Sequence, residues 1–289
     1  MAEVLKGVPV AVKLTEELTA RCERLKALRI TPALAILRVG EKPGDIAYES
    51  GALKRCEKIG IAVLKIVLPS DAKPEEIISV ISKINEIIRE INADESIHGL
   101  LMFRPLDDKD SERSASELLV PEKDVDCMTN SSLVGVFTGS GTGYPPCTAQ
   151  ACVELLDYYG INVAGKNVAI IGRSLVIGRP VAMLLMNLNA TVTICHSKTK
   201  NLAEVCKKAD VIIAAAGRAK FIDSNFVSNG QTVIDVGINV DADGKLCGDV
   251  DYDSVSEIVD TITPVPGGVG AVTTAVLAKH VIESAERVL

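Results

Sequence analysis

Residues 168–180 read VAIIGRSLVIGRP, and this stretch decides the fold. Its first four residues, 168–171, are apolar and predict a buried parallel strand that ends at Gly172. A helix is predicted to begin near Gly178 and Pro180, because proline suits the first turn of a helix. A strand, a glycine turn and a helix hold the pyrophosphate of a dinucleotide against backbone amides and a helix N-terminus. The stretch therefore predicts where a cofactor binds.

The spacing of this motif, with Ser174 between Gly172 and Gly178, differs from the common G-x-G-x-x-G pattern. The alternative interpretation is an ordinary glycine-containing turn between a strand and a helix that binds no cofactor. Three further apolar runs favour the cofactor site, because they follow at the spacing of alternating strands and helices. These runs are ATVTIC (190–195), VIIAAA (211–216) and TVIDV (232–236). Together they predict a doubly wound, Rossmann-like sheet.

The end of the second predicted strand indicates which dinucleotide binds. An NAD site usually has Asp or Glu there for the ribose hydroxyls, whereas an NADP site needs cations and hydroxyls for the extra phosphate. Here the segment 196–200 reads HSKTK, so it begins with His196 and Ser197 and holds no acid, and Arg173 adds a guanidinium in the first turn. NADP is therefore predicted in preference to NAD, and a solvated basic loop is the alternative.

The composition excludes several classes of protein. The chain has 289 residues, 47% hydrophobic and 24% charged, which is typical of a globular protein with two domains. A net charge of −7 and the absence of tryptophan argue against a nucleic-acid-binding protein. The eight cysteines form no C-x-x-C pair and only three histidines are present, so no metal site is predicted. No apolar run is long enough to span a membrane and no signal peptide is visible, so we expect a cytoplasmic enzyme with reduced thiols.

The N-terminal half also alternates strands and helices, which predicts a second α/β domain. Helices are expected at 10–28, at 45–60 with Asp45 as the cap and Gly60 as the stop, and at 74–92; strands are expected at 32–39, 61–68 and 98–103. The glycine-rich link 139–143 precedes a helix expected at 147–159, and a last helix is expected at 272–289. The predicted domains are 1–145 plus 271–289, which carries the catalytic residues, and 146–270, which binds the dinucleotide.

In these motifs the chain resembles the bifunctional methylenetetrahydrofolate dehydrogenase and methenyltetrahydrofolate cyclohydrolase family over nearly its whole length. The motifs are Arg38-Val39-Gly40 with Tyr48, Lys123-Asp124-Val125-Asp126, Pro146-Cys147-Thr148, Gly172-Arg173-Ser174 with Gly178 and Pro180, His196-Ser197, Asp235-Val236-Gly237-Ile238-Asn239, Gly248-Asp249-Val250, and Thr263-Pro264-Val265-Pro266-Gly267-Gly268-Val269-Gly270. Each motif alone is weak, but the set is highly specific.

The resemblance implies a cleft between two α/β domains, with folate in the cleft and NADP along the C-terminal sheet. It implies hydride transfer from 5,10-methylenetetrahydrofolate to NADP, then hydration of the methenyl product to 10-formyltetrahydrofolate, in one-carbon metabolism and purine biosynthesis. Tyr48 and Asp126 are the implied catalytic residues. The implied cofactor residues are Gly172, Arg173, Ser174, Gly178, Pro180, His196, Ser197 and Ile238, and the implied substrate residues are Tyr48, Asp126, Pro266, Gly267 and Gly268. The resemblance also implies a homodimer, with the C-terminal sheet domain as the predicted contact.

One departure from the family pattern falls on the lysine of the Y-x-x-x-K motif, which serves the hydration chemistry. That position is Ala52 here, and the nearest lysine is Lys54. A residue four positions after Tyr48 lies about 40° from it around a helix, whereas one six positions on lies about 120° away. Lys54 is therefore predicted to be a solvated surface lysine, unless Gly51 distorts the helix.

A second departure lies in the strand that ends at Phe103, where the family has the glutamine that hydrogen-bonds the catalytic lysine. Arg104 follows in place of leucine. Losing both members of a polar pair leaves neither one buried without its partner, so the two changes are interpreted as coordinated. Ala149, Ala271 and Val272 also depart from the usual residues, whereas the cofactor side matches closely.

The sequence therefore predicts an NADP-dependent methylenetetrahydrofolate dehydrogenase with weak or absent cyclohydrolase activity. A fully bifunctional enzyme that uses Arg104 or Lys54 in place of the missing lysine is a second hypothesis, although arginine is a poor proton acceptor. A non-catalytic protein that binds NADP or folate is a third hypothesis, and a dehydrogenase that acts on another substrate is a fourth.

Overall fold

The computed structural model describes residues 2–69, 74–106 and 109–289, and the chain divides into two compact units. The first consists of Met1–Val12 and Thr148–Thr273 and is called here the six-stranded unit. The second consists of Lys13–Cys147 and Thr274–Leu289 and is called the three-stranded unit. Each unit has its own sheet and its own core, so the expectation of two α/β domains agrees with the fold.

The six-stranded unit is built on the four strands that the apolar runs predicted. These are β5 (Asn167–Ile171), β6 (Thr191–Cys195), β7 (Val211–Ala214) and β8 (Thr232–Asp235), in the spatial order β6-β5-β7-β8. All their pairings are parallel, and Ile171 at the end of β5 lies opposite both Cys195 and Ala214. The carboxyl ends of these strands therefore share one edge of the sheet, and the segments that leave them lie side by side.

Two short strands complete this sheet: β11 (Thr261–Ile262) pairs with β8, and β1 (Glu3–Val4) pairs with β11. The sequence predicts that residues 1–145 share one domain, but residues 1–12 belong to the six-stranded unit. A two-residue strand has no periodicity that could predict it, and its place depends on a partner more than 250 residues away.

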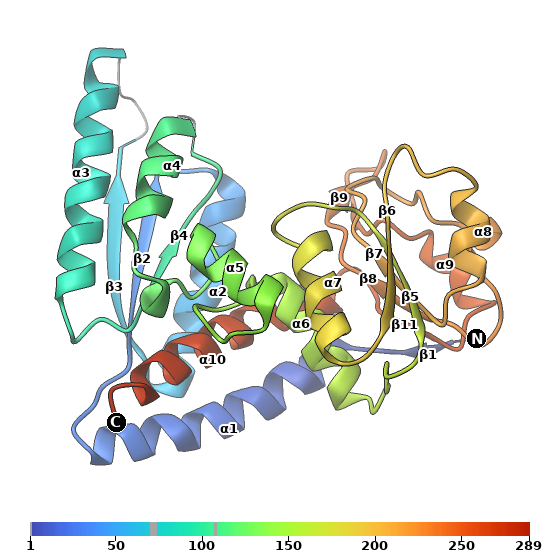
Figure 1. The fold of residues 1–289 in the computed structure, drawn as a ribbon, viewed down its shortest axis with the longest axis horizontal. Helices are drawn as coiled ribbons and strands as arrows, with labels where there is room; N and C mark the ends of the chain where they lie inside the picture. The colour runs from blue at the N-terminus through green and yellow to red at the C-terminus, as the bar shows by residue number, and fades with distance from the viewer. Residues whose placement is uncertain (1, 70–73, 107–108) are drawn as a thin grey trace. The chain divides into compact units, whose positions relative to one another are not determined.

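Helices cover both faces of the six-stranded sheet (Figure 1). One face packs a buried aliphatic core against α8 (Leu202–Lys207) and α9 (Tyr252–Ser256), with Ile212 and Val233 fully buried. The other elements of this unit are α6 (Cys147–Tyr158), α7 (Gly178–Asn187), the 3₁₀ turns η2 (Ser224–Phe226) and η3 (Val269–Ala271), and the antiparallel pair β9 (Asn239–Val240) and β10 (Leu246–Cys247).

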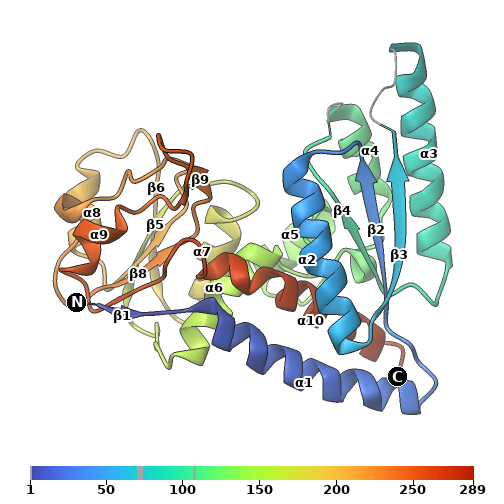
Figure 2. The ribbon, with the colours of Figure 1, turned by 180° about the vertical axis from the view of Figure 1, so that it is seen from behind.

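The three-stranded unit has β2 (Ala33–Val39) at the centre of its sheet, with β3 (Ala62–Leu68) and β4 (Gly99–Met102) on either side. Both pairings are parallel. Helix α2 (Pro43–Ile59) covers one face, and α3 (Pro74–Ala93) and α4 (Lys109–Leu118) cover the other (Figures 1 and 2). The remaining elements are η1 (Pro121–Lys123), α5 (Asn130–Thr138) and α10 (Thr273–Glu286), while α1 (Gly7–Ala27) begins in the other unit.

The ends of α2 correct one expectation and confirm another. Asp45 is not the N-cap: Lys42 is at that position and its side chain does not cap the helix, and Pro43 occupies the first turn. Asp45 lies in the first turn, where its carboxylate interacts favourably with the helix dipole. Gly60 ends the helix as expected, with a left-handed φ of 92°.

Three further expectations concern thiols, membranes and metals. All eight cysteines are buried and none forms a disulfide, so they pack as small hydrophobic residues. Within the described ranges, no helix has the length and apolar character needed to cross a bilayer. The same residues contain no cluster of three or more His, Cys, Asp or Glu side chains suited to a metal ion.

Candidate functional site

The glycine turn after β5 brings two backbone segments into close contact. Gly172 has a φ of 137°, and a Cβ built on it would lie 2.1 Å from the carbonyl oxygen of Ala215. A Cβ on Gly178 would lie 2.3 Å from the carbonyl oxygen of Gly172. Side chains at either position would push the strand, the turn and the helix apart, so glycine is required at both.

Ser174 connects this turn to the start of α7. Its hydroxyl accepts hydrogen bonds from the backbone N–H groups of Ile177, at 3.1 Å, and Gly178, at 3.5 Å. Pro180 lies buried in the first turn of α7, where a missing N–H costs nothing. The serine thus holds the turn in the shape that presents the N-terminus of α7.

A cavity of about 340 Å³ lies beside this turn and brings several predicted cofactor residues together. Gly172, Arg173 and Ser174 line it together with His196 and Ser197, which follow β6. The other lining residues are Ile171, Leu202, Ala215, Ala216, Arg218 and Phe221. Among these described residues there is no carboxylate, while two guanidiniums and two hydroxyls are present, a donor set that fits a phosphorylated nucleotide. Gly178, Pro180 and Ile238 are outside this lining, and Ile238 is 72% exposed.

The side chain of His196 is held in one orientation by its own turn. Its Nδ1 accepts a hydrogen bond from the N–H of Lys198 at 3.1 Å, and its backbone N–H donates to the hydroxyl of Thr199 at 2.8 Å. With Nδ1 acting as an acceptor, the proton of the neutral ring is on Nε2. The ring can therefore donate a hydrogen bond from Nε2.

Asp249 was not predicted as a site residue, but it fixes a wall of the cavity. Its fully buried carboxylate accepts hydrogen bonds from three consecutive backbone N–H groups, those of Ala216 at 2.5 Å, Gly217 at 2.9 Å and Arg218 at 2.8 Å. It also accepts one from the side-chain amide of Asn239 at 2.9 Å. A carboxylate that receives this many donors locks the segment after β7 in one conformation.

Asp235, at the end of β8, holds the backbone of Asp249 in place through a hydrogen bond. It accepts hydrogen bonds from the N–H groups of Gly237 at 2.9 Å, Asp249 at 3.0 Å and Val250 at 3.0 Å. Burial and, less strongly, the Asp249 carboxylate raise the pKa of Asp235 to about 6, against the effect of the three N–H donors, which lower it. No local pattern indicated either role, because most of the donors come from segments distant in the sequence.

On the three-stranded unit, Tyr48 projects from α2 and is half-buried. The ring of Phe103 meets it edge to face, with centroids 6.1 Å apart and planes at 82°. Ala52, one turn after Tyr48, is fully buried. Helix α2 continues without interruption through Gly51, and Lys54 is exposed, so the interpretation of Lys54 as a surface lysine is confirmed.

A buried ion cluster anchors α2 to the sheet next to Tyr48. Glu49 forms ion pairs with Arg38 of β2, at 2.9 Å, and with Lys65 of β3, at 2.5 Å. Burial alone would raise the pKa of the Glu49 carboxyl, but hydrogen bonds from Lys65 and Arg38 hold it below its ordinary value. The cluster fixes the register of α2 on the sheet and thereby the position of Tyr48.

The two aspartates of the KDVD motif have different roles. Asp124 is fully buried and accepts hydrogen bonds from the N–H groups of Met128 at 2.7 Å and Thr129 at 2.8 Å, as expected of a turn aspartate. Asp126 is half-buried, and its Oδ1 accepts from the N–H of Cys147 at 3.0 Å. Burial raises the pKa of Asp126, while hydrogen bonds from Cys147 and, less strongly, the positive charge of Arg104 oppose that rise. Arg104 therefore lies close enough to Asp126 to act on its charge.

The predicted substrate residues 266–268 belong to the six-stranded unit, whereas Tyr48 and Asp126 belong to the other. Gly267 has a φ of 103°, and its carbonyl oxygen accepts a hydrogen bond from the N–H of Gly7 at 2.8 Å. A Cβ on Gly7 would lie 2.1 Å from the carbonyl oxygen of Gly268. The start of α1 thus lies against this segment.

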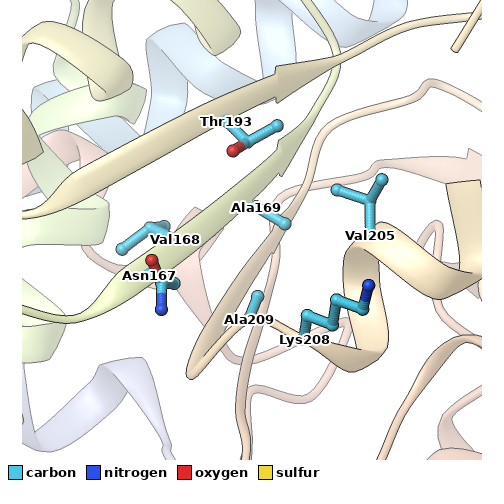
Figure 3. Close-up of a pocket in the computed structure, with 7 residues that line it drawn as sticks. All are labelled: Asn167, Val168, Ala169, Thr193, Val205, Lys208 and Ala209. Atoms are coloured by element: carbon cyan, nitrogen blue, oxygen red, sulfur yellow. The ribbon is translucent and has the colours of Figure 1, made fainter.

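A second cavity in the six-stranded unit, of about 430 Å³, contains none of the predicted residues (Figure 3). It is lined mainly by aliphatic groups of β5 and α8, with Asn167, Thr193 and Lys208 as its polar members. Asn167 begins β5, so this cavity reaches the end of the strand opposite Gly172. Its lining gives no reason to connect it with the nucleotide site.

Comparisons with known proteins also divide the chain in two, with a boundary near residue 147, but they assign residues 5–12 and 274–289 to the opposite part. The model of the tetrahydrofolate dehydrogenase/cyclohydrolase catalytic domain matches residues 5–126, and the model of the NAD(P)-binding domain of the same family matches residues 146–289. The bifunctional protein FolD of Carboxydothermus hydrogenoformans is 51% identical over 288 residues, covering 99% of this chain and 98% of that protein.

Two solved structures show the same fold. The bifunctional FolD enzyme of Campylobacter jejuni is 37% identical with a TM-score of 0.93 and complete coverage of both chains. The Trypanosoma brucei FolD enzyme, solved with NADP and an inhibitor, is 30% identical with a TM-score of 0.90, over 99% of this chain and 98% of that one.

Proposed function

Because the chain belongs to the tetrahydrofolate dehydrogenase/cyclohydrolase family, we propose that it oxidises 5,10-methylenetetrahydrofolate to 5,10-methenyltetrahydrofolate with NADP as the oxidant. The observation that carries this proposal is the cavity after β5, where a glycine turn, a helix N-terminus and a carboxylate-free set of donors are next to one another. NADP, when bound, accepts the hydride on its nicotinamide ring.

The cofactor site fits a dinucleotide phosphate for a steric reason as well as an electrostatic one. Gly172 and Gly178 carry no Cβ, so the strand, the turn and the start of α7 pack closely together, which places the N-terminus of α7 next to the cavity. Arg173, the Nε2 of His196 and the hydroxyl of Ser197 add donors to the same cavity. The residues that would hold NADP are thus Gly172, Arg173, Ser174, His196 and Ser197, while Gly178 and Pro180 shape the start of α7.

The folate-side residues orient the substrate. The ring of Tyr48 offers a face for the flat pterin, and Phe103 supports that ring from its edge. The carboxylate of Asp126 accepts hydrogen bonds from a pterin amino group and ring N–H, and one of its oxygens is already steadied by the N–H of Cys147. Hydride transfer depends mainly on alignment of two carbons, so these contacts are the main contribution of this side.

The substitution Asp126→Asn tests the assignment of the substrate. It removes the charge that two N–H donors need, so we expect kcat/KM for methylenetetrahydrofolate to fall about 100-fold. The affinity for NADP should stay unchanged, because Asp126 and the cavity after β5 belong to different units. Formation of the methenyl absorbance measures the first quantity and calorimetric titration the second. NADP reduction that is indifferent to folates would contradict the proposed substrate.

We also propose that hydration of the methenyl product is much weaker here than dehydrogenation. Ala52 replaces the lysine expected in the family and is fully buried, and Phe103 lies against Tyr48 instead of offering a hydrogen bond. Attack by water on the methenyl carbon needs a proton acceptor within hydrogen-bond reach. Methyl and phenyl groups give none.

Arg104 gives the bifunctional hypothesis its one favourable observation, because its charge acts on Asp126. If Arg104 replaces the missing lysine, the substitution Arg104→Ala should abolish hydration of the methenyl product. If Arg104 has no such role, as we propose, the rate of hydration should be the same in the variant and the wild type.

The substitution Arg104→Ala should also move the acid limb of the dehydrogenase pH profile to higher pH. Removing the cation takes away one of the effects that oppose burial, so the pKa of Asp126 rises further and the carboxyl stays protonated, unable to accept from two N–H donors, to a higher pH. An acid limb that does not move would contradict the role given to Asp126.

We propose that the enzyme is a cytoplasmic homodimer joined through the six-stranded sheet. β6 is an edge strand with Thr191 and Thr193 exposed. The exposed side chains of Met186 and Leu188 lie just before it in the sequence. An unpaired strand edge beside apolar groups favours pairing with a second copy. Sedimentation equilibrium of the purified protein measures the mass of the assembly.

A further inference from the structure

Arg218 follows β7 and lines the cavity of the nucleotide site together with Arg173 and Ser197. No motif singled it out, because an exposed arginine after a Gly-containing turn has no local signature. The cavity has a volume of about 340 Å³, so a ligand inside it is within reach of both guanidiniums. In the described part of the chain neither guanidinium forms an ion pair, which leaves both charges available for an anion.

The position of Arg218 is fixed from two sides. Its backbone N–H donates to the buried carboxylate of Asp249 at 2.8 Å. Its guanidinium carbon lies 4.3 Å from the centroid of the Phe221 ring, and Phe221 in turn packs against Phe226 with centroids 5.4 Å apart. Stacking on a ring occupies one face of the guanidinium and leaves the N–H groups at its edge free. The arginine is thus held in place before any ligand arrives, which lowers the entropy cost of binding.

We propose that Arg218 is a specificity-determining residue that binds the 2′-phosphate of NADP together with Arg173. The inference rests on the proposed NADP-dependent function and adds a residue to its cofactor site. A phosphate monoester carries close to two negative charges at neutral pH, and two guanidiniums match that charge. NAD has only a hydroxyl at this position, so the pair of arginines gives a reason for selection between the two cofactors.

The test compares two probes that lack nicotinamide and differ only in the phosphate of interest, 2′,5′-ADP and 5′-AMP. Calorimetric titration of the full-length protein gives the dissociation constant of each. Arg218→Ala should weaken 2′,5′-ADP about ten-fold or more, the cost of a lost charge-assisted contact, and change 5′-AMP by less than about two-fold. Arg218→Lys should lie between, because it keeps the charge and loses the planar fork.

Lys220→Ala is the matched control. Lys220 is two residues further along the same segment and is exposed, but it pairs with Asp241 and does not line the nucleotide cavity. It removes one positive charge from the same surface, so unchanged selectivity in this variant excludes a general charge effect. Thermal unfolding of each variant shows whether the fold is kept.

The outcomes separate the inference from the function on which it rests. A wild-type protein that binds both probes equally well contradicts the NADP site itself. A wild-type preference that persists in Arg218→Ala overturns the role of Arg218 alone. An equal rise in the dissociation constants of both probes also overturns the role of Arg218. The arginine would then pack on the adenine or hold the segment after β7 without binding the 2′-phosphate.

Discussion

Two side chains on the three-stranded unit carry most of what distinguishes this chain from its family pattern. Ala52 and Phe103 stand where the family resemblance implies a lysine and a glutamine that hydrogen-bond to each other. Phe103 now meets Tyr48 edge to face, while Ala52 is sealed from solvent. The exchange leaves no buried polar group without a partner and keeps the tyrosine in place. One reaction can therefore persist while the chemistry that needs a proton acceptor is lost.

This interpretation predicts an asymmetry between a single and a double substitution. Ala52→Lys puts an ammonium in a buried position without a partner and should lower the free energy of unfolding by about 3 kcal/mol. Adding Phe103→Gln provides an acceptor, so the double variant should regain part of that stability and gain hydration activity. Chemical denaturation and the decay of methenyltetrahydrofolate absorbance measure the two effects. A double variant as unstable as the single one, and as inactive in hydration, would show that the two positions do not act as a pair.

At the residue scale, the sequence was informative where helix geometry alone decided the answer. The angular offset of Lys54 from Tyr48 predicted a surface lysine, and Lys54 is exposed on an unbroken α2. Arg218 and Asp249 were beyond such reasoning. Their places depend on a ring three residues further on and on backbone N–H groups more than thirty residues away.

At the scale of elements, buried carboxylates tie together the segments that leave the sheet. Asp249 holds the segment after β7, and Asp235 holds the segment after β8 together with the backbone of Asp249. Both segments leave the carboxyl edge of the parallel sheet, where nucleotides bind in this class of fold. The wall of the cofactor cavity therefore depends on these two side chains.

Asp235 predicts a pH dependence of stability. Its folded pKa of about 6 lies above the value of about 3.9 expected in the unfolded chain. Between these two pKa values Asp235 is protonated in the native state and ionised in the unfolded chain. Its contribution to the free energy of unfolding is therefore fully present below pH 4 and is lost as the pH rises through about 6. Asparagine cannot titrate. Its NH2 group also replaces one of the two carboxylate oxygens that accept hydrogen bonds from backbone N–H groups. The free energy of unfolding of Asp235→Asn should lie further below that of the wild type at pH 4.5 than at pH 7.5, by up to about 2–3 kcal/mol.

Denaturant unfolding of the two proteins at matched pH measures this difference, and other titrating groups cancel in the comparison. A deficit of equal size at both pH values would contradict the raised pKa of Asp235.

The elements themselves were largely predictable because their patterns are long. Strands β5, β6, β7 and β8 follow four apolar runs, and Gly60 ends α2 as a left-handed glycine must. The exceptions are short or need a distant partner. β1 has only two residues and pairs with β11. The N-cap of α2 is Lys42 and not Asp45, because the helix begins at Pro43.

At the scale of the whole molecule, the chain crosses between the two units three times, after Val12, Cys147 and Thr273. Neither unit is a continuous piece of sequence, so neither is expected to fold alone as an excised fragment. The six-stranded unit carries the nucleotide motifs with the family's residues, although the departures Ala149, Ala271 and Val272 also belong to it, whereas Ala52, Phe103 and Arg104 belong to the three-stranded unit. We therefore expect oxidation of the folate to be retained and hydration to be the activity that is weakened.

The most direct measurement follows 5,10-methenyltetrahydrofolate with the purified enzyme and without any nicotinamide cofactor, against the uncatalysed rate in the same buffer. Formation of the methenyl absorbance from methylenetetrahydrofolate and NADP, run beside it, shows that the protein is active. The account predicts rapid NADP-dependent formation and a decay no faster than in buffer. Clear acceleration of the decay would contradict it and would assign the hydration step to another group, with Arg104 the first to replace.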